Sequence, residues 1–241
     1  MPSNLQAGNY QDTAIKGVRI QFTYRPSIFP LSWLNAGINA KGEPILPGEI
    51  SRVKMLMVRA LSKYPDTVLQ KELRAVYFLR SMSMYNVIYG GTNSRDAVYL
   101  TDNGVDMGYT DAFIEQTFHH EFSSILYRNY PALLDTMVWK AANIPNFDYN
   151  DPEGGLGAIR KDESSQDLDT ALCRIGFLTQ YAYSDMENDV NTIAQNLFKP
   201  SPGFWNIVNT YPRIKEKVRL LVNFYIKISS GFNQQFFMKM N

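Results

Sequence analysis

Hydrophobic positions along the chain repeat with two different periods. Val18, Ile20, Phe22 and Tyr24 alternate with polar residues, which is typical of a half-buried strand. From about residue 49 to 63 the apolar residues recur every three or four positions and predict an amphipathic helix. The beginning of the chain therefore predicts a strand that is followed by a helix.

Further along the chain, the same patterns predict two more strands and three more helices. Apolar runs at residues 73 to 79 and 97 to 100 have the length and composition of strands, and residues 89 to 93 between them are turn-rich. Residues 26 to 48 and 145 to 167 have no regular period and predict long loops. The predicted helices cover about residues 111 to 129, 185 to 198 and 212 to 229.

The order of these elements predicts one α+β domain, because the chain shows no internal repeat and no linker. Residues 1 to 16 are polar and are expected to form a loose segment before a domain at residues 17 to 241. The sheet is expected to end by about residue 130, with a mostly helical part after it. A chain of 241 residues that is 45% hydrophobic can bury a substantial core.

Composition excludes several classes of function. A formal net charge of +1 gives no basic surface for nucleic acid, and no apolar run reaches the length of a membrane-spanning helix. The chain also lacks the basic and apolar order of a signal peptide at its beginning. With Cys173 as its single cysteine, the chain can form neither an internal disulfide nor a thiolate zinc cluster.

Both histidines of the chain lie side by side in the predicted helix at residues 111 to 129. At roughly 100° per residue, His120, Ser124 and Tyr127 project from one face, with Glu121 beside it. His119 points roughly 100° away from His120, so the two cannot easily share one metal ion. An apolar stripe on another face is expected to meet the core, and consists of Ile114, Phe118, Phe122 and Ile125.

His120 and Glu121 match the first half of the zinc peptidase motif HExxH. In that motif two histidines at i and i+4 aim at one ion, and the glutamate takes a proton from the zinc-bound water. Ser124 stands where the second histidine belongs, and a neutral hydroxyl is a poor zinc ligand. The local alternative is a histidine and a glutamate that form hydrogen bonds near the edge of the core.

Three blocks of sequence extend the match beyond this helix. The chain resembles a family of predicted zinc-binding metallopeptidases among bacterial surface lipoproteins, which are similar to gluzincins. The resemblance implies a zincin-like α+β fold in which a small mixed sheet packs on the active-site helix. The blocks are Gly90-Gly91-Thr92 with Thr117 to Phe122, Gly176 to Ser184 with Glu187 and Asp189, and Tyr211 to Lys215.

The resemblance assigns His120 and Glu187 as zinc ligands and Glu121 as the general base. Ser124 removes one ligand, so zinc is expected to bind weakly or not at all, and Asn188 replaces an acidic residue that the family usually has. Glu187 has an alternative role, because Ser184 and Glu187 have the spacing of a capping box.

The resemblance also suggests how a substrate would bind. In zincins the strand before the active-site helix often lies at the sheet edge and pairs with the substrate backbone, which makes Ala97, Val98 and Tyr99 the candidates here. Tyr181 and Tyr183 could donate a hydrogen bond to a reacting carbonyl, or could simply pack in the core or its rim.

Three hypotheses of function follow from the sequence. The first is a zinc-dependent metallopeptidase with a degenerate site. The second is an inactive zincin-fold module that binds a peptide, a glycan or a partner lipoprotein, since a fold persists when its site changes. The third is a scaffold in which the two histidines are only a polar patch. The resemblance implies a secreted protein or a lipoprotein of the outer surface.

Overall fold

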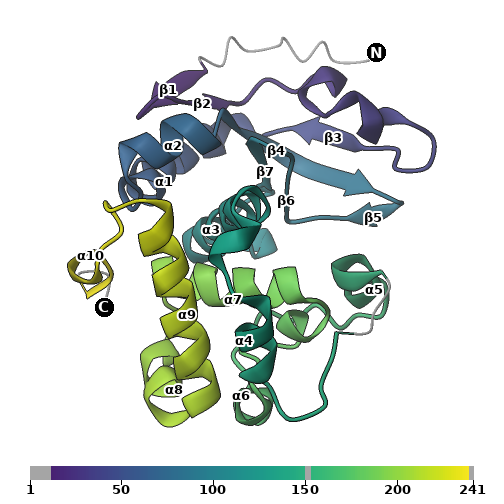
Figure 1. Ribbon diagram of the computed structural model, residues 1–241. Coiled ribbons are helices and arrows are strands. Elements are labelled where there is room, and N and C mark those ends of the chain that lie inside the picture. The colour runs from purple at the N-terminus through teal and green to yellow at the C-terminus, as the bar shows by residue number, and fades with distance from the viewer. Residues whose placement is uncertain (1–11, 150–152, 239–241) are drawn as a thin grey trace, which may run out of the picture.

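The computed structural model describes residues 12–149 and 153–238, and its first half is organised by a mixed β-sheet (Figure 1). Seven strands of the described residues pair in the order β1-β2-β4-β7-β6, with β3 and β5 added to the far half of β4. The strands are β1 Thr13–Ile15, β2 Val18–Gln21, β3 Lys41–Pro44, β4 Ala75–Met84, β5 Val87–Ile88, β6 Gly91–Asn93 and β7 Ala97–Thr101.

The three inner strands β2, β4 and β7 run parallel to one another, whereas β1 and β6 are antiparallel to their neighbours. All five residues of β7 are buried, as expected for a strand that is covered on both faces. Because β7 pairs with both β4 and β6, the expectation that Ala97, Val98 and Tyr99 form the edge strand is wrong. The strand at this edge of the described sheet is β6, in a segment that the sequence predicted as a turn, and β1 lies at the other edge.

Helices make up most of the second half of the chain (Figure 1). The long ones agree with the helical periods read from the sequence, and the short ones carry too few residues to show a period. Helices in the described residues are α1 Ile50–Ser62, α2 Asp66–Glu72, α3 Asp111–Asn129, α4 Thr136–Ala141, α5 Gly154–Arg160, α6 Thr170–Ile175, α7 Met186–Phe198, α8 Phe204–Thr210, α9 Pro212–Ile228 and α10 Gln234–Met238.

The two faces of the sheet are covered by different parts of the chain. Alternate residues of β4 and β7, such as Val76 and Val98, join α1, α3 and α7 in the main core. On the opposite face Tyr77 and Tyr99 stack with ring centroids 5.1 Å apart, and Phe29 packs on Tyr99. The segment from 26 to 40, predicted as loop, therefore seals the second face with aromatic side chains.

The fold class predicted from the sequence, an α+β domain with a small mixed sheet and a mostly helical second part, is confirmed. Several local predictions are wrong, including the loop at residues 26 to 48, which contains β3. Residues 13 to 15 are not loose but pair with β2, and the segment from 145 to 167 contains helix α5. Residues 1 to 11 of the expected loose segment lie outside the described residues. Across the part of the chain that is described, no helix is both long and apolar enough to span a membrane.

Candidate functional site

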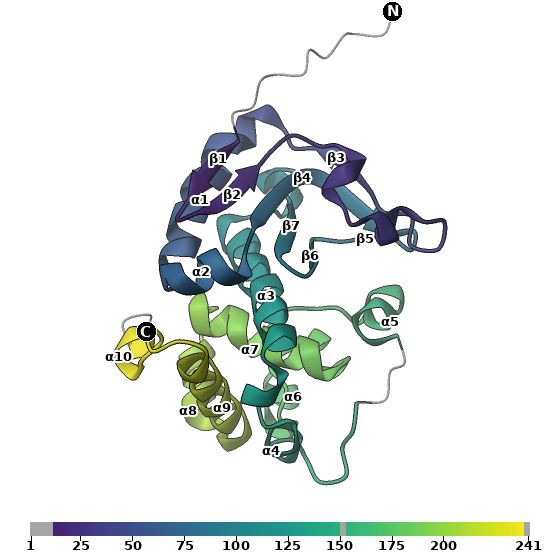
Figure 2. The ribbon, with the colours of Figure 1, turned by 45° about the horizontal axis from the view of Figure 1, so that its top comes forward.

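Helix α3 lies between the sheet and α7 and carries both histidines (Figure 2). Thr110 caps it, since the Thr110 hydroxyl accepts the Phe113 N–H at 3.2 Å. The predicted apolar stripe is buried, and Phe118 and Phe122 are fully inaccessible. The faces of α3 therefore follow the helical spacing, and the two histidines point to different surroundings.

His119 is a core residue. Its ring is fully buried and stacks on Phe198 at 5.2 Å, and its Nδ1 lies 2.8 Å from the Tyr64 hydroxyl. Burial lowers the pKa of His119 to about 4, so the ring is neutral near pH 7. Glu115 lies 3.7 Å from His119 Nε2 and binds Lys63 at 2.6 Å. His119 belongs to a structural network inside the protein.

His120 faces α7 and is held by an amide chain. Its Nδ1–H donates to Gln195 Oε1 at 2.8 Å, and Gln195 Nε2 donates to Gln166 Oε1 at 3.1 Å. Because the Gln195 amide nitrogen is engaged by Gln166, the Gln195 oxygen faces the ring and favours a proton on Nδ1. In a neutral ring with this tautomer, His120 Nε2 is an acceptor, and it has no hydrogen-bond partner among the described residues. The Tyr181 ring packs beside it, with centroids 5.8 Å apart.

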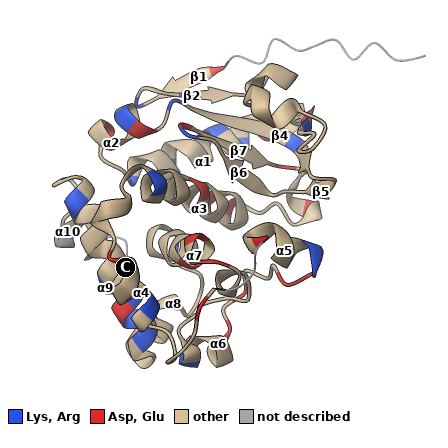
Figure 3. Cartoon of the chain, turned by 45° about the vertical axis from the view of Figure 1, so that its right-hand side comes forward, with Lys and Arg blue, Asp and Glu red and all other residues tan. Residues whose placement is uncertain are grey.

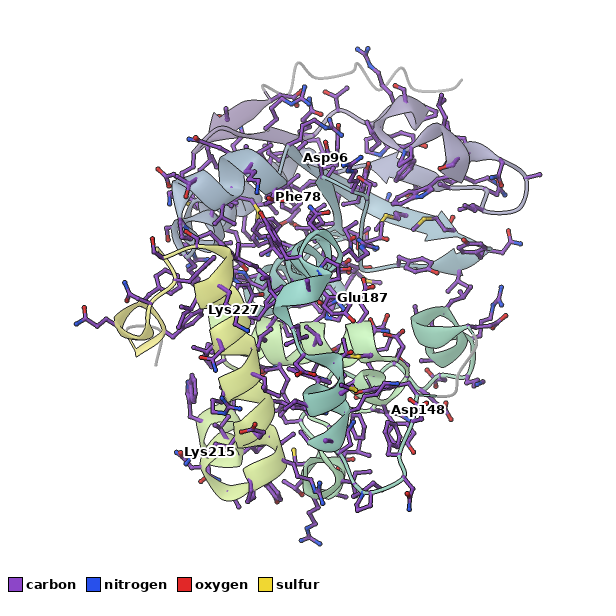
Figure 4. The ribbon with its side chains drawn as sticks, in the orientation of Figure 1. Phe78, Asp96, Asp148, Glu187, Lys215 and Lys227 are labelled. Carbon is purple, nitrogen blue, oxygen red and sulfur yellow. The ribbon has the colours of Figure 1, made fainter. Side chains whose placement is uncertain are left out.

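Ser124 and Glu187 meet across α3 and α7. The Ser124 hydroxyl donates to Glu187 Oε1 in a short hydrogen bond, and Arg128 lies 3.7 Å from the same oxygen. The structure thus brings together the position of the missing histidine and the predicted downstream carboxylate, Glu187, which Figure 4 labels. The hydroxyl occupies one of the lone pairs that a metal would need.

The capping-box hypothesis for Glu187 is wrong. Asp185 is the residue that caps α7, and its carboxylate accepts the Asn188 N–H at 2.7 Å. The Ser184 hydroxyl instead donates to the Tyr181 carbonyl and accepts from the Asn188 amide. Glu187 is therefore free of the helix terminus and turns toward Ser124.

Glu121 lies half-buried beneath the sheet edge. Asn93 of β6 donates its side-chain amide to Glu121 Oε2 at 2.5 Å. Burial raises the pKa of Glu121, while neighbouring His120 and the Asn93 hydrogen bond partly oppose the shift. Gly91 permits this approach, because a Cβ there would lie 2.3 Å from Thr117 Cγ2 and 3.2 Å from Glu121 Oε1. The Gly90-Gly91-Thr92 block is thus explained by close packing of β6 on α3.

The side chains around His120 do not fit a closed zinc site. Within residues 12–149 and 153–238, no group of three His, Cys, Asp or Glu side chains is placed to hold a metal ion. The available donors are one imidazole and the Glu187 carboxylate, which Ser124 already engages. Zinc sites in proteins use at least three such ligands. Any zinc is therefore held weakly at most.

A cleft of about 240 Å³ opens beside His120 and Glu121. Figure 3 shows acidic positions on α3 and α7, the helices that meet near it. Tyr181 lines this cleft, whereas Tyr183 lines a separate cavity of about 610 Å³ with Phe147. The structure therefore brings Tyr181 to His120 and does not bring Tyr183 there. Further residues along the cleft wall are Ile88, Gly91, Phe113, Gln166 and Gln195.

Asn93, Gln166 and Gln195 are the site residues that sequence reasoning missed. Asn93 lay in a segment predicted as turn, and Gln166 in one predicted as loop. Amides in such positions give no local signal, because their role depends on which ring or carboxylate lies opposite. Gln195 lies eight positions after Glu187 and therefore points roughly 80° away from it around the helix, so helical spacing alone does not single it out.

The opposite face of α7 contains a buried ion pair. Lys217 of α9 and Asp189 are both fully buried, with Nζ and Oδ2 2.5 Å apart. Trp139 donates to the same oxygen at 2.8 Å, and Lys217 also donates to the Gly176 carbonyl at 2.6 Å. Burial raises the pKa of Asp189 and lowers that of Lys217, while their mutual attraction opposes both shifts.

Comparison with known proteins supports the fold and leaves the activity open. A crystal structure from Bacteroides caccae, described as a "putative zinc-binding metallo-peptidase", superposes with a TM-score of 0.57 and 14% sequence identity. The match covers 93% of this chain and 84% of that one. No protein-family model and no curated protein matches the sequence. At this identity the likeness shows a shared fold.

Proposed function

We propose that this protein is a binding module with a metallopeptidase-like fold, which holds an extended peptide in the cleft beside α3 without zinc-dependent hydrolysis. The observation that carries the proposal is the pairing of Ser124 with Glu187. Two of the three positions that would hold zinc satisfy each other, and the third, His120, keeps one nitrogen for a ligand. The cleft is thereby retained while the metal site is lost.

The position of β6 at an edge of the sheet supports a peptide as the ligand of the cleft. Thr101 N–H binds the Gly90 carbonyl and Ser94 N–H binds the Ala97 carbonyl, so alternate residues of β6 face β7. By this alternation the backbone groups of Gly91 and Asn93 point away from the sheet. Gly91 also lines the cleft. A peptide added to this edge would extend the sheet and lie over Glu121.

The proposal is tested with a peptide selected from a random library and with hydrogen exchange. Binding is expected to slow amide exchange at Gly91 and Asn93, because their N–H groups would gain partners. N-methylation of the peptide is expected to abolish binding at alternate positions only, since every second peptide N–H would face β6. Loss at every position, or protection elsewhere in the chain with none at β6, would contradict this mode of binding.

A control on the protein side uses the second face of the sheet. Tyr99 and Trp33 pack together there with centroids 5.5 Å apart, and Trp33 is not part of the cleft. The Trp33→Phe variant should leave peptide binding unchanged while lowering stability slightly. A variant of this kind separates loss of binding from general loosening of the fold.

A further inference from the structure

We propose that the cleft recognises a primary ammonium group of its peptide, held between His120 Nε2 and the free oxygen of Glu121. This inference rests on the proposed function and names the chemistry that the bound peptide must carry. It depends on three features of the described residues: an acceptor nitrogen, a carboxylate without a basic partner, and an apolar rim.

The acceptor nitrogen belongs to a nearly buried ring. His120 is 7% exposed, and its Nδ1–H is used by Gln195. Its Nε2 has no partner among the described residues and lines the cleft with the rest of the side chain. A neutral imidazole with its proton on Nδ1 can only accept a hydrogen bond through Nε2. The ligand must therefore present a donor at this point.

Glu121 differs from the buried carboxylates of the molecule. Among the described residues, each Asp or Glu classed as buried lies within 4.0 Å of a Lys or Arg nitrogen, and these residues are Glu72, Asp102, Glu115 and Asp189. Glu121 is half-buried and has Asn93 as its hydrogen-bond partner. Among the described residues no Lys or Arg lies within 4.0 Å of its carboxylate, and Arg128 acts on it only from farther away. A cation in the cleft would supply the missing charge.

The free oxygen of Glu121 favours an ammonium over a guanidinium. A guanidinium binds a carboxylate best through both oxygens, but Asn93 already takes one of the two acceptor positions of Oε2 and hinders that geometry. An ammonium is compact, carries three donors and needs only one oxygen. His120 and Glu121 both line the cleft, so an ammonium bound there meets Glu121 Oε1 and His120 Nε2 as possible acceptors.

The rim of the cleft suits the carbon stem of such a group. Ile88 is 71% exposed and Phe113 is 36% exposed, and both line the cleft. Apolar side chains at this rim can cover methylene groups while the charged end reaches inward. A lysine side chain has both the carbon stem and the ammonium group. A peptide N-terminus has the ammonium group but no such stem.

The experiment measures the affinity of blocked Ala-Ala-Lys-Ala-Ala for the full chain by calorimetry, against counterparts with norleucine or arginine and against unblocked pentaalanine. The lysine peptide is expected to bind about tenfold tighter than the norleucine peptide, as a charge-assisted hydrogen bond would give. The arginine peptide should bind more weakly than the lysine peptide. A preference for unblocked pentaalanine over the blocked norleucine peptide would identify the terminal ammonium as the source and would also support the proposal.

Two variants locate the effect. Glu121→Gln keeps the shape of the side chain and is expected to remove the preference for lysine over norleucine. Glu216→Gln removes the same charge from the exposed end of an ion pair on α9 and is expected to keep the preference. If Glu121→Gln does not fold, nitrogen-15 shifts of the His120 ring in the parent protein should still move with the lysine peptide only.

The outcomes separate this inference from the proposed function. Equal binding of the lysine and norleucine peptides, or stronger binding of arginine, would overturn the ammonium site and leave a peptide-binding cleft standing. Failure of these peptides and of every library peptide to bind would overturn both. Retention of the lysine preference in Glu121→Gln would show that the charge is recognised elsewhere.

Discussion

The carboxylates of α3 and α7 have different partners on the buried side of these helices and on the cleft side. On the buried side, Glu115 meets Lys63 and Asp189 meets Lys217, each at hydrogen-bond distance. On the cleft side, Glu121 meets an amide and Glu187 meets a hydroxyl, with Arg128 farther away. The buried side therefore has its charges paired at hydrogen-bond distance, whereas on the cleft side Arg128 lies 3.7 Å from Glu187 and Glu121 has no Lys or Arg partner within 4.0 Å among the described residues.

The largest effect on the free energy of unfolding is expected when a carboxylate on the buried side loses its basic partner. Lys217→Met leaves Asp189 buried without a cation and should lower the free energy of unfolding by about 3 to 5 kcal/mol. Urea unfolding measures the change. Adding Asp189→Asn to the same protein should recover much of the loss, because no charge then remains buried. A loss below about 1 kcal/mol would mean that the pair is not desolvated.

The second-largest effect is expected from acid, which should lower the stability of the protein through His119. Its pKa is about 4 in the folded protein and near 6.5 when unfolded, so the unfolded chain binds a proton first as pH falls. Stability should therefore decline from pH 6.5 to 4 by about 2 to 3 kcal/mol and level off below that window with respect to this group. Denaturant midpoints across this range, compared with His119→Phe, measure the contribution. An identical slope in that variant would contradict it.

The smallest effects distinguish the two glutamates of α3. Glu115→Gln should destabilise the protein by about 1 to 2 kcal/mol, because Lys63 and His119 lose a charged partner. Glu121→Gln should be neutral or stabilising by up to about 1 kcal/mol, since it removes a desolvated charge that has no Lys or Arg within 4.0 Å among the described residues. Thermal unfolding of the two variants provides the comparison. Equal destabilisation would remove the distinction between the two sides.

The sequence predicted the long helices because their apolar stripes decide their orientation. The placement of Ile114, Phe118 and Phe122 in the core followed from helical spacing alone, as did the separation of His119 from His120. The edge strand was missed because Gly90 and Gly91 read as turn residues. Their small size serves the contact of β6 with Thr117 and Glu121, which is not visible from local propensity.

Only the part of the candidate site that lies on a single helix could be predicted from the sequence. His120, Glu121 and Ser124 share α3, so their relative placement was accessible from spacing. The pairing of Ser124 with Glu187 crosses 63 residues and depends on how α3 packs on α7. The expected surface location and lipoprotein partners stay predictions, since they derive from the family resemblance.

The most direct test of the account is the zinc content of the parent protein and of Ser124→His after dialysis in buffer without chelator. The parent protein is expected to retain well below one zinc per chain. Ser124→His should retain about one zinc per chain, because the new imidazole would join His120 and release Glu187 as a third ligand. One tightly held zinc per parent chain, lost in His120→Gln, would contradict the account and restore the metallopeptidase hypothesis.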